Sequence, residues 1–248
     1  SGFKCPKPLL NKENNPISNF KHKKLTILTF INGKSKENLT AENCKDIGIQ
    51  AATMHSLTAN LSISRKNSLS IKNWRKIFIN IKEPCSKIHK DLPRLIESNL
   101  NDVEKNWPSN LPSGIIHADL FKDNIIFDKN KVNGIIDFTF SCNEFYAFEV
   151  AICFNALCFD GHKNNLSFNV TKAKKFIDGY SSIRKLSDEE KDKIKILCQG
   201  AALRFLLTRV FDALNTVKGA IVNVKDPLEY LKRLEFHKNS KNYEDYFL

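Results

Sequence analysis

Two short apolar runs in the middle of the chain each end in an aspartate. Residues 115–124 read IIHADLFKDN, and residues 132–138 read VNGIIDF. Both runs predict short β-strands, and the segment DKNK between them predicts that residues 123–128 and 132–138 form a hairpin. Asp119 and Asp137, at the two strand ends, are either ordinary surface acids or the two sides of a single site that binds a metal ion and phosphate.

The rest of the chain predicts mainly helices. Thr40 can cap a helix that runs to about Leu57, with its apolar residues at helical spacing. Ser187 and Glu190 form a capping box at the start of a long helix that ends near Thr216. Further helices are expected at residues 71–82, 87–106, 145–159, 170–184 and 226–236, the last with Pro227 in its first turn. The pattern indicates an α+β fold with a mostly helical body and an embedded hairpin.

Composition narrows the class of partner. The chain of 248 residues carries a formal net charge of +12, but its lysines are scattered and no platform of aromatic and arginine residues stands out. We therefore expect no nucleic-acid partner. The positive electrostatic field that this net charge produces would, however, favour an anionic substrate such as a nucleotide. No apolar run approaches the roughly 18 residues that cross a bilayer, and the N-terminal segment has no signal-peptide core. A cytoplasmic protein without a membrane partner is expected.

The cysteines indicate a reducing compartment. Seven are present, and no C-x-x-C pair occurs among them. Most lie in apolar stretches, so buried free thiols are expected, and the thiolate spacing does not fit zinc. The cysteines are Cys5, Cys44, Cys85, Cys142, Cys153, Cys158 and Cys198.

The polar residues after the first apolar run have the spacing of a phosphoryl-transfer site. His117, Asp119 and Asn124 fit H-x-D-L-x-x-x-N, and Asp137 follows on the next strand, as in protein kinases. A carboxylate such as Asp119 can orient an attacking hydroxyl and accept its proton. Asn124 and Asp137 offer the oxygen ligands that Mg²⁺ prefers. His117 is expected to brace the loop through its ring, with Asp137 or Glu149 as partner, rather than to transfer protons.

Four segments resemble one family. They are GIIHADLFKDNIIF, GIIDFTFSCNEFYAFEVAICFNALCFD, GAALRFLLTRVFDALNT and KDPLEYLKRLEFH. Together they are similar to the homoserine kinases of the choline-kinase and aminoglycoside-phosphotransferase superfamily, which have a protein-kinase-like fold. The resemblance runs from about residue 5 to the end. It implies ATP-dependent phosphorylation of the hydroxyl of L-homoserine to O-phospho-L-homoserine, a step of threonine biosynthesis, with ATP and Mg²⁺ as cofactors.

The resemblance also implies roles for single residues. Asp119 takes the place of the catalytic base, and Asn124 and Asp137 take the places of the magnesium ligands. Residues 24–33 predict a strand that Gly33 closes, and within it Thr29, Phe30 and Ile31 correspond to the hinge whose backbone meets adenine. Glu149 stands where relatives usually carry aspartate, and it is expected to support the catalytic loop by hydrogen bonds.

L-Homoserine carries a carboxylate, which suits an arginine. Arg204 and Arg209 lie in the otherwise apolar segment ALRFLLTRVFD, where a charge needs a partner. Each either pairs with an acid such as Asp212 or Glu149 or faces the substrate. Arg204 is the first candidate for the carboxylate anchor and Arg209 the second. Weaker candidates for the substrate pocket are Asn143, Glu144 and Asn155.

The chain also departs from the family pattern. Nothing before residue 24 supplies a glycine-rich loop or a strand lysine, so residues 1–33 are expected to be a remnant of the small lobe with the hinge. Residues 34–248 are expected to form the helical C-terminal lobe, and such a fragment is expected to bind ATP poorly. Protein kinases carry a lysine where this chain has Phe121; Lys122 follows it and is expected to face water.

Two other functions remain open from the sequence. Choline, ethanolamine or aminoglycoside kinases act on cationic substrates, which favour acids or an aromatic cage rather than Arg204 and Arg209. A non-catalytic kinase-like binding module is favoured by the missing small-lobe elements. The intact set of Asp119, Asn124 and Asp137 argues against it.

Overall fold

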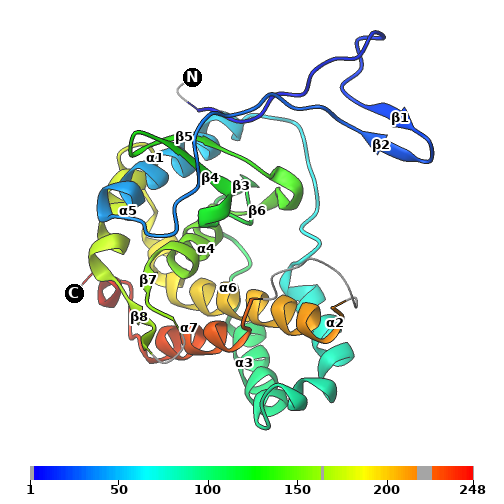
Figure 1. Ribbon diagram of the computed structural model, residues 1–248. Helices are drawn as coiled ribbons and strands as arrows, with labels where there is room; N and C mark the ends of the chain where they lie inside the picture. Colours follow the sequence, from blue (N-terminus) through cyan, green and yellow to red (C-terminus); the bar gives the residue numbers. More distant parts are fainter. Residues whose placement is uncertain (1–2, 163–164, 217–224, 248) are drawn as a thin grey trace.

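Helices dominate the body of the molecule. The computed structural model describes residues 3–162, 165–216 and 225–247, and an N-terminal arm, residues 3–33, projects from the helical body (Figure 1). The α-helices are α1 (Ala41–Thr58), α2 (Ile71–Ile81), α3 (Leu92–Asn106), α4 (Tyr146–Leu157), α5 (Val170–Ser181), α6 (Asp188–Leu214) and α7 (Leu228–Asn239). Short 3₁₀ turns are η1 (Pro84–Lys87), η2 (Lys122–Asn124), η3 (Phe138–Phe140) and η5 (Glu244–Tyr246).

The described strands form two-stranded antiparallel sheets. The pairs are β1 (Ser18–Phe20) with β2 (Lys23–Leu25), β3 (Ser113–Ile116) with β6 (Cys142–Phe145), β4 (Ile125–Asp128) with β5 (Lys131–Ile135), and β7 (Phe159–Asp160) with β8 (Ser167–Phe168). Ile116 lies opposite Cys142, so the end of β3 is fixed against β6. The loop after β3 and the end of β5 therefore start from anchored positions.

The predicted elements hold with three corrections. The hairpin is confirmed as β4 and β5, and so are the helix cap at Thr40, which also forms a capping box with Asn43, and the predicted capping box at Ser187. The predicted strand over residues 24–33 is wrong beyond Leu25, because its partner β1 is only three residues long. Helix α3 begins at Leu92 rather than residue 87, since the chain first makes the turn η1. Pro227 is the N-cap of α7 rather than part of its first turn.

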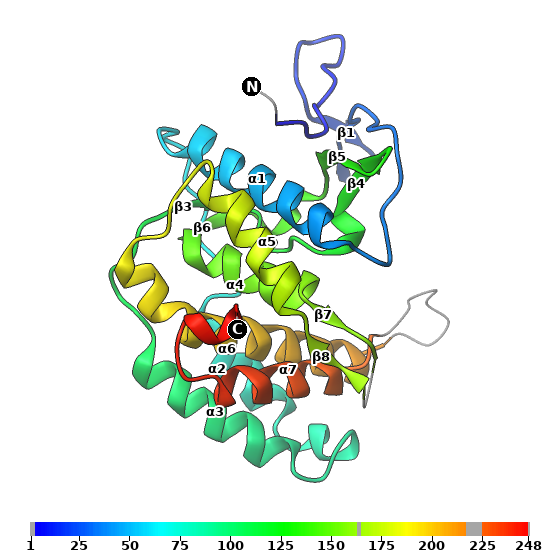
Figure 2. The same ribbon diagram turned by 90° about the vertical axis from the view of Figure 1, so that its left-hand side faces the viewer.

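Helices α1 and α5 lie against one another with their backbones in contact (Figure 2). A Cβ atom at Gly48 would lie 2.1 Å from the carbonyl oxygen of Phe176. A Cβ atom at Gly179 would lie 2.1 Å from the carbonyl oxygen of Lys45. One glycine on each helix therefore makes this close approach possible.

The core is centred on α4 and α6. Every residue of α4 is buried, and α6 is buried on all sides through its middle, as expected of an interior helix. This burial encloses polar side chains, among them Glu149 and Arg204. Six cysteines are buried and Cys5 is half-buried, all as free thiols, which confirms that prediction. No helix in the described part of the chain is long and apolar enough to cross a membrane.

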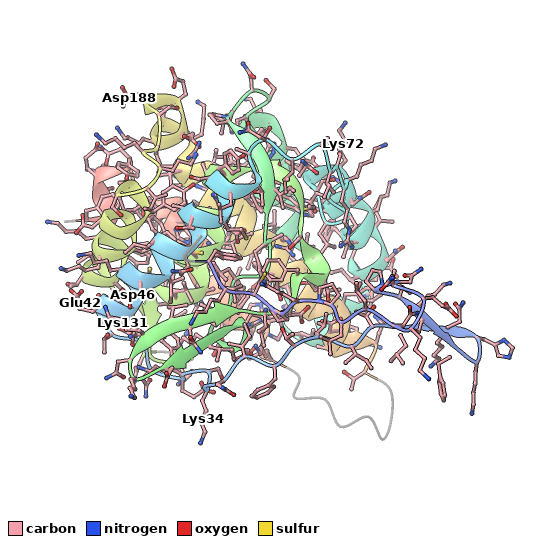
Figure 3. All side chains as sticks on the ribbon, turned by 90° about the horizontal axis from the view of Figure 1, so that it is seen from above. Lys34, Glu42, Asp46, Lys72, Lys131 and Asp188 are labelled. Carbon is pink, nitrogen blue, oxygen red and sulfur yellow. The ribbon has the colours of Figure 1, made fainter. Side chains whose placement is uncertain are left out.

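The hairpin is tied to the helical body at its outer edge. Figure 3 shows Lys131 of β5 beside Asp46 of α1, and the Lys131 Nζ lies 3.3 Å from the Asp46 Oδ2. Lys36 adds a hydrogen bond to the side chain of Asn130 in the hairpin turn. The β4–β5 hairpin, which precedes Asp137, is therefore held by these surface contacts as well as by its buried side chains.

Candidate active site

The loop after β3 is held by its own histidine. The Nε2 of His117 lies 2.9 Å from the carbonyl oxygen of Ile136, and its Nδ1 accepts the backbone N–H of Asp119 at 3.2 Å. These contacts assign the ring proton to Nε2. The ring braces the loop, but the predicted ring partners, Asp137 and Glu149, are wrong. A backbone carbonyl just after the neighbouring strand β5 takes that place.

Both backbone groups of Ala118 are held by buried side chains. Glu149 accepts the N–H groups of His117 and Ala118 on one carboxylate oxygen, the second at 3.0 Å. Arg204 donates from Nη1 to the carbonyl oxygen of Ala118. Ala118 has φ of 65°, a left-handed conformation that is strained for a residue with a Cβ. The two charged side chains therefore stabilise the strained turn that presents Asp119.

Asp119 faces the side chain of Asn124. The Nδ2 of Asn124 donates to the backbone oxygen of Asp119 at 2.8 Å and to its Oδ2 at 3.2 Å. These bonds use the amide N–H₂ and leave the Oδ1 of Asn124 for another partner. Burial raises the pKa of Asp119 above its usual range, while the charges of Arg204 and His117 oppose the rise. A carboxylate with a raised pKa is a stronger proton acceptor near neutral pH.

Asp137 lies next to this loop. The backbone N–H of Ile136 donates to the carbonyl oxygen of Asn124 at 3.0 Å. Asp137 has φ of 62°, and its Oδ1 accepts the backbone N–H and the hydroxyl of Thr139. Within the described part of the chain, its other carboxylate oxygen has no hydrogen-bond partner. That oxygen and the Oδ1 of Asn124 are two unpaired hard ligands, a donor set that fits Mg²⁺.

A cleft of about 1140 Å³ opens beside Asp137. Thr29, Phe30 and Ile31 line one side of it, and residues 136–139 line the other. The structure therefore brings the expected hinge residues and one expected metal ligand to the same cleft. Among the described residues, no partner bonds the backbone N–H groups of Phe30 and Ile31.

The two arginines of α6 have different surroundings. Arg204 is 3% exposed and contacts the catalytic loop, with its guanidinium carbon 4.5 Å from the ring centre of Phe205. Arg209 donates to the backbone oxygen of Asp226 at 3.1 Å and lies 3.4 Å from the Oε2 of Glu229. The predicted acid partners, Asp212 and Glu149, are therefore wrong for Arg209. Glu229 lies on another helix, so the spacing along the chain gives no signal of its pairing with Arg209.

The weaker pocket candidates have structural partners. Asn143 accepts the backbone N–H of Arg65 at 2.7 Å, and Glu144 accepts from the side chain of Asn67 at 2.9 Å. Asn155 is fully buried in the core, where it bonds two backbone carbonyls and His237, so its pocket assignment is wrong.

Lys122 also differs from expectation. Its Nζ donates to the backbone oxygen of Glu37 at 2.8 Å, and the residue is partly buried. The prediction that it faces water is wrong, because the segment before α1 passes over it.

A second cavity, of about 440 Å³, lies beside the catalytic loop. Of the residues that line it, the sequence indicated only Arg209 as a contact of the substrate. The missed signal is the helical spacing of Glu229 and Arg233, which places both on one face of α7. The lining includes Phe121, Arg209, Lys225, Asp226, Glu229 and Arg233.

Comparisons with known proteins agree with this geometry. Residues 1–183 match the family model described as "Phosphotransferase enzyme family". The chain is 42% identical to a homoserine kinase of Xanthobacter autotrophicus, over 100% of this chain and 76% of that protein. It is 41% identical to a homoserine kinase of Bradyrhizobium diazoefficiens, over 100% of this chain and 75% of that protein.

Solved structures of low identity share the fold. Amicoumacin kinase hAmiN, in complex with AMP-PNP, Ca²⁺ and its ligand, has a TM-score of 0.69 at 11% identity, covering 98% of this chain and 74% of that one. An ethanolamine kinase of Plasmodium vivax has a TM-score of 0.63 at 18% identity, covering 90% and 66%. The expected mostly helical, protein-kinase-like α+β fold is confirmed.

Proposed function

Because this chain belongs to the homoserine kinases of the phosphotransferase enzyme family, we propose that it transfers the γ-phosphoryl group of ATP to the side-chain hydroxyl of L-homoserine. The family membership confirms the resemblance inferred from the sequence. The product is O-phospho-L-homoserine, which serves threonine biosynthesis. The observation that carries the proposal is that Asn124 bonds the Oδ2 of Asp119 through its amide N–H₂ and bonds, through its backbone oxygen, Ile136, the residue before Asp137. Among the described residues, the Oδ1 of Asn124 and one carboxylate oxygen of Asp137 have no partner.

Asp119 acts as the general base in this proposal. It orients the acceptor hydroxyl and takes its proton as the oxygen bonds to the γ-phosphorus and the bond from that phosphorus to ADP breaks. Burial, which raises the pKa of Asp119, makes the carboxylate a better acceptor. Asn124 and Asp137 would hold Mg²⁺, which when bound neutralises charge on the phosphates. His117 positions the loop through Ile136 and does not itself transfer a proton.

The nucleotide is assigned to the larger cleft. Its volume of about 1140 Å³ accommodates ATP, and it reaches from the hinge to Asp137. Adenine would pair with the free backbone N–H groups of Phe30 and Ile31, beside Thr29, whose own N–H is bonded to the backbone oxygen of Lys7. On this assignment we keep the division expected from the sequence, in which the arm and hinge end at residue 33 and the helical lobe begins at residue 34.

The acceptor site is assigned from the arginines. Arg209 lines the smaller cavity and is the better candidate for the substrate carboxylate. Arg204 is buried and already bonded to Ala118, which favours a role in positioning Asp119. Asn143 holds the backbone of Arg65, so any contact with the acceptor is secondary.

A panel of acceptors tests the proposal. The purified protein is incubated with Mg-ATP and L-homoserine, choline, ethanolamine or an aminoglycoside, and phosphorylated products are followed by ³¹P NMR. We expect transfer to L-homoserine, and a loss of roughly 10²–10⁴ in kcat for Asp119→Asn. Asp128→Asn, the same change at an exposed hairpin position, should leave the rate unchanged.

The other outcomes separate the alternatives. Faster transfer to choline, ethanolamine or the aminoglycoside would assign the chain to a different branch of the fold. Folded protein without transfer to any acceptor would support the non-catalytic module. An undiminished rate in Asp119→Asn would remove the base mechanism.

A further inference from the structure

The smaller cavity contains an ion cluster of which the proposal above uses only Arg209. Glu229 and Arg233 are four residues apart on one face of α7, and Arg209 reaches them from α6, which packs along α7 (Figure 1). The Oε2 of Glu229 lies 3.4 Å from the Nη1 of Arg209 and 3.9 Å from the Nη1 of Arg233. One carboxylate therefore lies between two guanidinium groups, and the cluster has a net positive charge.

Among the described residues, Arg233 has fewer hydrogen-bond partners than Arg209. The residue is 9% exposed, and its Nε is buried without a hydrogen-bond partner. Among the described residues its polar contacts reduce to the 3.9 Å approach to Glu229, which is longer than a hydrogen bond. Its guanidinium otherwise faces the rings of Tyr230 and Phe159, at 4.5 Å and 5.3 Å. Burying a charged group with so few partners costs free energy unless a ligand supplies the missing hydrogen bonds and the opposite charge.

The cavity adjoins the catalytic loop. Phe121 lines it, and the backbone N–H of Phe121 donates to the backbone oxygen of Asp119 at 2.9 Å. Behind the cavity, the ring of Tyr230 lies 4.4 Å from the guanidinium carbon of Arg209. Burial raises the pKa of Tyr230; the charges of Arg233 and Arg209 oppose this rise, and that of Asp119 adds to it. The cavity that the two arginines line therefore borders the loop that carries the base.

We propose that this cavity receives the carboxylate end of the acceptor, with Arg233 as the main anchor, Arg209 as the second, and Glu229 holding both in place. The inference rests on the proposed function and adds to it the residues that distinguish an amino acid from an uncharged or cationic alcohol. Two guanidinium groups match the two oxygens of one carboxylate, as in other paired arginine sites. The cavity of about 440 Å³ has room for a small amino acid.

The test compares L-homoserine with 3-aminopropan-1-ol, the same molecule without its carboxylate. For the wild-type protein we expect kcat/KM to favour L-homoserine strongly. In Arg233→Gln this preference should fall at least 10-fold, mainly through a higher KM for L-homoserine, with the KM for ATP unchanged. In Arg233→Lys, part of the preference should return because the charge is kept.

Arg184→Gln is the matched control. Arg184 is a partly buried arginine whose guanidinium lies 2.8 Å from the carboxylate of Glu190, and Glu190 is in the first turn of α6. Its replacement makes the same chemical change and destabilises the fold, but it should leave the preference for L-homoserine over the amino alcohol unchanged. An equal loss of rate for both acceptors in Arg233→Gln would assign Arg233 a structural role and overturn the inference.

Direct binding separates this inference from the proposed function. Calorimetric titration of L-homoserine without ATP needs no phosphoryl transfer, and its affinity should fall at least 10-fold in Arg233→Gln. If the wild-type protein phosphorylates L-homoserine and the variant binds it equally well, the anchor is refuted and the function stands. If no transfer occurs but binding depends on Arg233, the function fails and the anchor stands.

Discussion

Arg204 of α6 donates a hydrogen bond to the carbonyl oxygen of Ala118, the residue that precedes Asp119. The contact joins positions that are 86 residues apart in the sequence, and it lies in the core, where Arg204 is 3% exposed. Glu149, on α4, accepts a hydrogen bond from the backbone N–H of Ala118. The candidate base is therefore positioned by two interior helices rather than by its own loop alone.

Replacing Arg204 distinguishes a role in positioning the loop that carries Asp119 from a role in binding the carboxylate of the substrate. Arg204→Met removes a charge-assisted hydrogen bond, of about 1.5–3 kcal/mol, from the turn that presents Asp119. We expect kcat to fall roughly 10- to 100-fold with little change in the KM for L-homoserine, measured by steady-state kinetics. Arg75→Met, at a partly exposed ion pair of α2, serves as the control. A raised KM with unchanged kcat would instead make Arg204 the carboxylate anchor, as the sequence first indicated.

Replacing Glu149 tests the other support of the turn. Glu149→Gln keeps the shape of the side chain but loses the charge that accepts two backbone N–H groups. We expect the free energy of unfolding to fall by about 1–3 kcal/mol in urea titrations, with a parallel loss of kcat. Glu97→Gln breaks a more exposed pair with Lys82 and should cost less than about 1 kcal/mol. Equal costs for both changes would show that Glu149 does not hold the loop.

The contact of α1 with α5 predicts an unusual effect of alanine. Alanine normally favours a helix over glycine by about 1 kcal/mol. At Gly48, however, the new Cβ would lie 2.1 Å from a backbone oxygen of α5, so the helices must separate. We expect Gly48→Ala to lower the melting temperature in thermal unfolding, whereas Ser98→Ala, at an exposed position of α3, should not. Stabilisation by Gly48→Ala would mean that the two backbones are not in contact.

Acid should destabilise the fold through buried histidine. His55 lies between the rings of Tyr146 and Tyr180, and burial lowers its pKa from 6.5 to about 3. The unfolded chain therefore takes up a proton that the folded protein does not. The resulting stability is complete above pH 6.5 and is lost as the pH falls toward 3, by about 2 kcal/mol at pH 5.

His55→Gln removes this titration. Urea unfolding followed from pH 7.5 to pH 5 should show a shallower loss of stability in the variant by about 2 kcal/mol, whatever its stability at pH 7.5. Identical pH profiles for the two proteins would contradict the burial of a neutral histidine at this position.

Local signals in the sequence identified much of the fold and part of the site. Residues close in the chain determine the hairpin turn, the helix cap at Thr40, the capping box at Ser187 and the periodicity of the helices, so these could be predicted. The spacing of Asp119 and Asn124 is local in the same way, because one tight turn joins them. The pairing of β3 with β6 was missed, because CNEF has little strand signal and gains its conformation from its partner.

What the sequence alone determined is which chemical groups stand at strand and helix ends: His117, Asp119, Asn124 and Asp137. What only the tertiary structure decided is which distant group each of them meets. His117 could have bonded several acceptors, and the residue that follows β5, Ile136, provides the one it bonds. Arg209 meets Glu229 because α6 packs along α7. Buried polar groups take whichever partners the packed helices bring within hydrogen-bond distance, and the spacing along the chain does not encode that distance.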